Sequence, residues 1–125
     1  MKKALFVMLA AGLIVGMTTG GTAEDKKKSA AKYTIKQIMK TAMKGGLCAK
    51  VAKGGGSEKD KLKLLDLTIS LLENKPKKGT QGAWAKKAGA LVYASARAAV
   101  GRKDAGALLK KAANCGACHK AHKGK

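Results

Sequence analysis

The sequence predicts an all-α protein, folded as an antiparallel up-down bundle of four helices. After residue 33 the chain is rich in Ala, Leu and Lys, which have high helix propensity. The chain contains one Pro and few β-branched residues. Apolar residues recur at helical spacing in four stretches joined by short connections, a pattern that favours antiparallel neighbours.

The first predicted helix covers about residues 34–53. Ile35 and Ile38 begin an apolar stripe with helical spacing. Gly45 and Gly46 interrupt this helix at a cost of about 1 kcal/mol each relative to Ala. We therefore expect a kink or local break at these two glycines.

The second predicted helix follows three consecutive glycines and ends near residue 73. Ser57 is its predicted N-cap, and acidic residues in the first turn complement the helix dipole. The residues expected to form the inner stripe are Leu62, Leu65, Ile69 and Leu72, widened by Leu64, Leu67 and Leu71.

Two further helices are predicted after the turn that contains Pro76. Thr80 caps the third, which runs to about residue 100. The residues expected to face inward from it are Trp84, Ala88, Leu91 and Val92. The fourth begins near Asp104 and continues through the C-terminal residues. On this single helix, one buried face is expected to hold Leu108, Ala112, Cys115 and His119.

The N-terminus has the pattern of a secretory signal peptide, residues 1–23. Lys2 and Lys3 precede an uncharged apolar run of 14 residues, and Gly21 and Ala23 suit cleavage before Glu24. A membrane-spanning helix needs about 20 apolar residues, so we expect no transmembrane span after cleavage. An uncleaved N-terminal tether is the alternative. The expected organisation is an exported, periplasmic protein with a flexible basic segment, residues 24–33, and one domain, residues 34–125.

The chain is strongly basic, with a net charge of +20. Removal of the two leader lysines leaves 25 Lys and Arg against 7 acidic residues, a net +18. This charge attracts acidic partners, and a basic polyanion-binding protein is a distant alternative. Export argues against intracellular nucleic acid. The mature chain also lacks a base-stacking platform, because its aromatic residues are only Tyr33, Trp84 and Tyr93.

The most informative motif is Cys115-Gly116-Ala117-Cys118-His119. Cys-x-x-Cys-His is the attachment signature of a c-type haem. The two thiols can form thioethers with the vinyl groups of one porphyrin, and the His119 imidazole can bind the iron as proximal ligand. The motif therefore predicts one covalent haem c, with its iron, enclosed by the bundle.

Two other interpretations of the motif are weaker. A zinc site from Cys115, Cys118, His119 and His122 would place four ligands within eight residues of one helix, whereas structural zinc sites usually join two separate ligand pairs. A thioredoxin-like redox pair would need a βαβ pattern around it, and none is present.

Two nearby candidates have less specific interpretations. His122 lies one turn beyond His119 and cannot reach the opposite face of the same porphyrin, so we expect it at the surface or beside a haem propionate. Cys48 is the odd thiol. We expect it to be a small buried residue, with pairing between two molecules as the alternative.

The C-terminal motif and the helical pattern together resemble the class II cytochromes c, the cytochrome c′ group and its low-spin relatives. The matching segments are residues 115–123 and residues 37–40. In low-spin members a Met followed by Lys, early in helix one, closes the sixth iron position; the resemblance thus implies that Met39 is the sixth ligand. Met43, one turn further on, competes for this role, and both methionines have the alternative of core packing. The chain departs from the group at His122 and Lys123, where many members carry an aromatic residue and an Arg.

Two main functions follow from the haem motif and the resemblance. The first is an electron carrier, not an enzyme, with iron ligated by His119 and Met39 and with transient docking to acidic redox proteins. The second is a five-coordinate haem protein that binds nitric oxide or carbon monoxide. A peroxidase-like activity ranks below both because no distal His/Arg pair is identifiable. The resemblance also implies that a homodimer could form through the first two helices.

Overall fold

The computed structural model of this chain describes residues 31–124. These residues form α-helices and one π-helical segment, and there is no strand among them. The predicted all-α class is confirmed. The predicted signal peptide, residues 1–23, lies outside the described residues, as do residues 24–30 of the predicted flexible segment. No helix within residues 31–124 combines the length and apolar character that crossing a membrane requires.

The first predicted helix is broken where two glycines interrupt it. Its three parts are α1 (Ile35–Ile38), the π-helix η1 (Met39–Lys44) and α2 (Leu47–Ala52). Thr34 caps α1, because its side chain accepts a hydrogen bond from the Gln37 amide while the Gln37 side chain accepts one from the Thr34 amide. Gly46 has a left-handed φ of 74°, which ends the π-helix and starts α2 in a new direction. The predicted break is confirmed.

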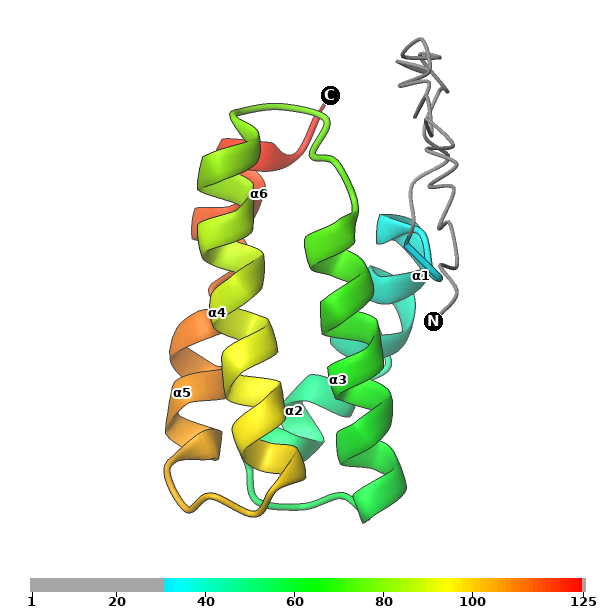
Figure 1. Cartoon of the computed structure of the whole chain (residues 1–125), viewed down its shortest axis with the longest axis vertical. Helices are drawn as coiled ribbons and strands as arrows, with labels where there is room; N and C mark the ends of the chain where they lie inside the picture. Colours follow the sequence, from blue (N-terminus) through cyan, green and yellow to red (C-terminus); the bar gives the residue numbers. More distant parts are fainter. Residues whose placement is uncertain (1–30, 125) are drawn as a thin grey trace, which may run out of the picture.

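The two long helices, α3 (Glu58–Glu73) and α4 (Gln81–Ala99), pack side by side along the molecule (Figure 1). Ser57 caps α3 and Thr80 caps α4, as predicted; each side chain accepts a hydrogen bond from an amide three residues later. Trp84 joins the two helices, because its indole Nε1 donates a hydrogen bond to the carbonyl of Leu71 at 3.0 Å.

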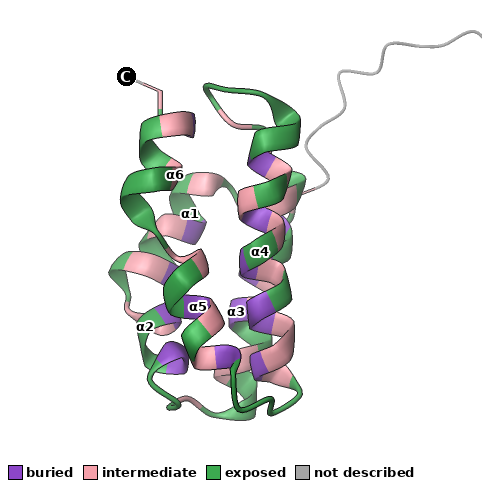
Figure 2. Ribbon diagram, turned by 90° about the vertical axis from the view of Figure 1, so that its left-hand side faces the viewer, coloured by how far each residue is buried: buried purple, intermediate pink, exposed green. Residues whose placement is uncertain are grey.

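The inner stripe predicted for α3 is wrong, because the buried leucines lie on a different side of the helix. Leu64, Leu67 and Leu71, expected to be its margin, are fully buried, whereas Leu62 is 58% exposed and Ile69 is 39% exposed. The buried leucines of α3 belong to the core that this helix shares with α4, α1 and α2. Figure 2 shows buried residues interspersed with exposed ones along α4. Leucines lie on both sides of this helix, so the spacing alone could not choose the buried side.

The predicted single C-terminal helix is also wrong, because the chain forms two helices. They are α5 (Ala105–Ala112) and α6 (Cys115–His122). Ala113 leaves the helical conformation with ψ 42°, and the Asn114 side chain then accepts a hydrogen bond from the Ala117 amide as an N-cap. The break changes the rotational phase of α6, so Cys115 and His119 are exposed instead of buried.

The helix α5 is held close to α2 at the opposite end of the molecule from α6. A Cβ atom on Gly106 would lie 2.5 Å from the carbonyl oxygen of Ala52, so only glycine allows this approach of the two backbones. Leu109 of α5 is fully buried. These contacts anchor α5, and α6 follows it along the same side of α4 (Figure 1).

Candidate functional site

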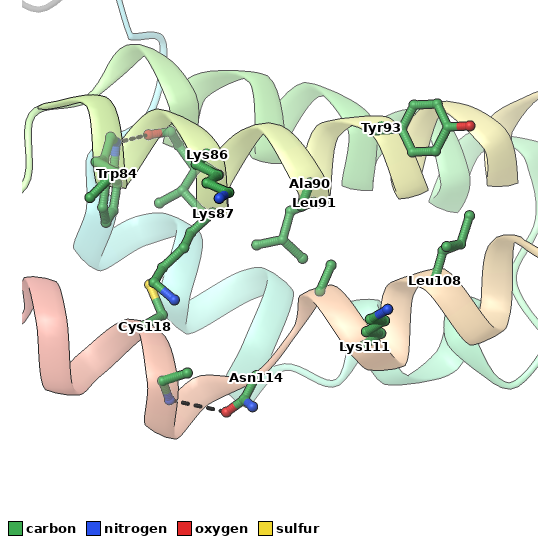
Figure 3. Close-up of a pocket in the computed structure, with 15 residues that line it drawn as sticks. Trp84, Lys86, Lys87, Ala90, Leu91, Tyr93, Leu108, Lys111, Asn114 and Cys118 are labelled. Atoms are coloured by element: carbon green, nitrogen blue, oxygen red, sulfur yellow. Dashed lines mark hydrogen bonds between the residues drawn. The ribbon is translucent and has the colours of Figure 1, made fainter.

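A cavity of about 600 Å³ lies between α4 and the two C-terminal helices. Its volume is in the range of sites that hold small molecules and cofactors. Figure 3 shows α6 and α5 on one side of this space and α4 on the other. The apolar side chains that line it include Leu71, Trp84, Ala88, Leu91, Leu108 and Ala112.

Lysine side chains supply the charge on the lining of this cavity. Lys86 and Lys87 come from α4 and Lys111 from α5, and none of the acidic residues within 31–124 lines the same space. Tyr93 also lines it, although its side chain is mostly exposed. The cavity thus combines an apolar wall with a positive potential, which favours a largely apolar ligand that carries anionic groups.

Cys118 is the cysteine of the motif that the structure brings to the cavity, and its neighbour Ala117 lines the cavity as well. Cys118 is half-buried, packs against the hydrophobic core and lines the space between α4 and α6 (Figure 3). Burial raises the pKa of its thiol, and the positive charge of Lys87 partly opposes that rise. Cys115 is exposed, and its Sγ lies 3.7 Å from the carbonyl oxygen of Ala113.

His119 is exposed on α6 and does not line the cavity. No other described residue makes a hydrogen bond or ion pair to its imidazole, so both ring nitrogens are free of a competing protein partner. The expected buried position of His119 is therefore wrong. The cause is the helix break at Asn114, which rotates α6 so that residues 115 and 119 lie on its exposed face.

Met39 and Met43 both lie in the π-helix η1. Each is partly buried and packs against the same hydrophobic core that Cys118 contacts. Neither methionine lines the cavity. A π-helical turn within a helix is rare and is frequently found at functional sites, so η1 gives the predicted ligand segment an unusual backbone. The sequence pattern did not predict this π-helix.

His122 is buried, and the expected surface position is wrong. Only 4% of its surface is exposed, and its ring packs edge-on against Trp84 with centroids 5.4 Å apart. Its Nδ1 lies 3.1 Å from the carbonyl oxygen of Lys78, in the loop between α3 and α4. The sequence did not identify this loop as a partner of α6. The available signal was that His122 stands where the resembling family often has an aromatic residue.

Cys48 is a buried free thiol on α2, as predicted. Burial raises its pKa, and the nearby Cys115 thiol contributes in the same direction. All three cysteines of the chain are described, and all three are free thiols. A buried Cys48 is shielded from pairing with a second molecule.

Comparisons with protein-family models, curated proteins and solved structures found no match for this chain. Within the described part of the chain, no three His, Cys, Asp or Glu side chains converge as a metal-binding group.

Proposed function

We propose that this chain is an exported c-type cytochrome that carries electrons in the periplasm. The observation that carries the proposal is an apolar cavity of about 600 Å³ directly beside Cys118, the second cysteine of a Cys-x-x-Cys-His motif. The motif supplies the attachment chemistry, and the cavity supplies a space of the size and polarity that a cofactor needs.

The composition of the core supports the binding of a haem. The described residues contain only three aromatic side chains, and many of their buried residues are alanines, which bury little surface each. A porphyrin is large, flat and apolar, so it fits the wall formed by Leu71, Trp84 and Leu91. When bound, its iron would supply reversible one-electron exchange between Fe(II) and Fe(III).

The two cysteines and the histidine of the motif each have a defined role in this proposal. Cys115 and Cys118 hold the porphyrin through thioethers, and His119 is the proximal ligand, whose imidazole has no protein partner to displace. Met39 is the sixth ligand, with Met43 as the less favoured candidate. The π-helix holds both methionines against the core that Cys118 also contacts.

The four-helix arrangement belongs to the same proposal. The segments α1, η1 and α2 together form the first helix of the bundle, and α5 and α6 form the fourth. The long helices α3 and α4 stand between them in the chain. This grouping preserves the up-down order expected of a four-helix bundle and assigns each break to a sequence signal at Gly46 or Asn114.

The basic lining supports acidic redox proteins as partners. Lys86, Lys87 and Lys111 can pair with the haem propionates or with acidic residues of a docking protein. An electron carrier needs brief encounters, and positive charge near the exposed cofactor edge accelerates them while leaving them sensitive to salt.

A second candidate function is a five-coordinate haem protein that binds nitric oxide or carbon monoxide. The observation that favours it is that the cavity is lined by Leu71, Ala88 and Leu91, while neither methionine reaches it. An apolar wall without a ligating atom would leave the sixth iron position open to a small gas.

The optical spectrum of the purified holoprotein, in both oxidation states and with and without carbon monoxide, tests these proposals. A low-spin spectrum with a methionine–iron charge-transfer band supports the electron carrier. A high-spin spectrum of the ferric protein, together with rapid carbon monoxide binding to the ferrous protein, supports the gas-binding function. A protein with no haem absorbance, purified from a host that matures c-type cytochromes, contradicts both.

A further inference from the structure

His122 is the most deeply buried residue of α6, and the functions proposed above assign it no role. Its Nδ1 is within hydrogen-bond distance of the Lys78 carbonyl oxygen. A carbonyl oxygen only accepts hydrogen bonds, so Nδ1 carries the proton and Nε2 is the unprotonated nitrogen of the neutral ring. Nε2 is buried and has no hydrogen-bond partner among the described residues. The neutral imidazole is therefore held in one tautomer and one orientation.

The loop that contacts His122 packs closely against the C-terminal end of α6. Gly79 has a positive φ of 81°, and a Cβ atom there would lie 2.8 Å from Nδ1 of His122 and 3.0 Å from the carbonyl oxygen of Ala121. Only glycine permits both the backbone conformation and the close approach. The loop between α3 and α4 therefore forms a fitted seat for the last turn of α6.

The seat of His122 is connected to the wall of the cavity. The His122 ring packs edge-on against Trp84, which lines the cavity and is itself fixed by its hydrogen bond to the Leu71 carbonyl. Cys118 lies four residues before His122, and residues four apart share one face of an α-helix. Seating His122 therefore turns Cys118 toward the cavity.

We infer that His122 is a positioning residue that fixes the rotation of α6, and so sets the approach of the Cys-x-x-Cys-His motif to the cofactor. This inference rests on the proposed function, because it concerns how α6 presents a haem. The hydrogen bond to Lys78 fixes the end of the helix, and the contact with Trp84 fixes its distance from α4. Loss of the seat would let α6 rotate, and it would change how His119 is presented to a bound haem.

Three substitutions of His122 in the haem-loaded protein separate its contributions. His122→Ala removes both contacts, His122→Phe keeps a ring against Trp84, and His122→Asn keeps a side-chain N–H that can donate to the Lys78 carbonyl. Lys120→Ala is the matched control, because Lys120 is an exposed residue of the same helix. The measurements are the rate of carbon monoxide binding to the ferrous protein and the hydrogen–deuterium exchange of α6 amides.

We expect His122→Ala to accelerate exchange in α6 about tenfold, the size of effect expected for loss of one partly buried hydrogen bond. The carbon monoxide rate should change in the same variant, and His122→Asn should recover most of both properties. Lys120→Ala should match the wild type. The inference would be overturned if His122→Asn and His122→Ala changed the exchange and the carbon monoxide rate equally. It would also be overturned if His122→Ala lowered the midpoint of urea unfolding but left the carbon monoxide rate at the wild-type value.

A second pair of variants tests the seat from the loop, without altering α6. Gly79→Ala places a methyl group against His122, whereas Gly54→Ala has a similar φ of 84° and nothing within 4 Å of the new Cβ. Gly79→Ala should therefore reproduce the exchange and carbon monoxide changes of His122→Ala, and Gly54→Ala should not. This pair decides the question if His122→Ala and His122→Phe do not fold. Identical behaviour of the two glycine variants overturns the inference.

The same samples distinguish this inference from the proposed function. A wild-type protein without covalent haem overturns the proposed function and the role of His122 together. A haem-loaded wild type whose His122 variants all behave like the wild type overturns the role of His122 alone.

Discussion

Cys118 and His122 lie one helical turn apart on α6 and share the face of that helix that meets α4. Cys118 lines the cavity, and His122 packs against Trp84, which lines the same cavity. Cys115 and His119 have the same four-residue spacing but lie on the exposed side. The motif is thus divided between two faces of one short helix, with one thiol at the cavity and the proposed iron ligand facing outward.

The buried face of α3 is tested by a matched pair of leucine substitutions. Leu67→Ala should lower the free energy of unfolding by about 2–5 kcal/mol, because it leaves a cavity in the core. Leu62→Ala makes the same chemical change at a side chain that is 58% exposed and should cost about 0.5 kcal/mol or less. Urea denaturation followed by circular dichroism measures both. Equal losses in the two variants would contradict the observed orientation of α3.

The sixth ligand is tested by a second matched pair, in the π-helix. Met39→Ala should convert a six-coordinate low-spin spectrum into a five-coordinate one and remove the methionine–iron charge-transfer band. Met43→Ala removes the other partly buried methionine and should leave that band in place. Absorption spectra of the ferric proteins measure the change. An unchanged spectrum in Met39→Ala would exclude Met39, and a lost band in Met43→Ala would assign the ligand to Met43.

The carboxylate of Asp66 gives a pH dependence to stability. Lys32 Nζ lies 2.9 Å from its Oδ2, and this hydrogen bond is the main reason that the pKa of Asp66 lies below its usual value. A carboxyl with a depressed pKa in the folded state stabilises the fold above the unfolded-state value, near 3.9, and loses that contribution as the pH falls through the folded-state pKa.

Asp66→Asn should therefore lower the urea midpoint slightly at pH 7, and the difference from the wild type should shrink below about pH 4. The effect is small because the pair is on the surface. Lys32→Ala serves as the control, since its effect should not add to that of Asp66→Asn. A difference that persists unchanged at pH 3 would show that the ion pair is not its cause.

The basic lining of the cavity is tested with an anionic oxidant, ferricyanide. Lys87→Glu should slow oxidation of the reduced protein severalfold at low ionic strength, because it reverses a charge beside the proposed cofactor. Lys59→Glu changes the net charge equally from the exposed first turn of α3, and it should slow the reaction less. Stopped-flow kinetics across salt concentrations give both rates. Equal slowing in the two variants would mean that net charge alone, rather than the cavity lining, controls the encounter.

Local signals in the sequence predicted most helix ends correctly. Ser57 and Thr80 cap the helices that they were expected to cap, and the break at Gly46 follows from a residue that adopts positive φ without strain. These signals act within one or two turns of the chain, so they can be interpreted without knowledge of the tertiary structure.

The rotation of each helix about its own axis was harder to predict, because it depends on tertiary packing. Leucines on both sides of α3 gave two plausible stripes, and packing into the shared core selected the one that contains Leu67. Asn114 lies within a helical pattern, yet it caps a new helix and exposes His119. The seat of His122 could not be predicted because it depends on a loop more than forty residues away in sequence.

The covalent link between Cys115, Cys118 and one haem is tested most directly by the intact mass of the exported protein. The measurement uses protein from the periplasm of a host that matures c-type cytochromes. The account predicts the mass of the cleaved polypeptide plus one haem, with colour that stays with the protein after extraction with acidified acetone. Cys48→Ala should retain this mass, and the double variant Cys115→Ala/Cys118→Ala should lose it. The mass of the bare polypeptide, with all colour extracted, would contradict the account.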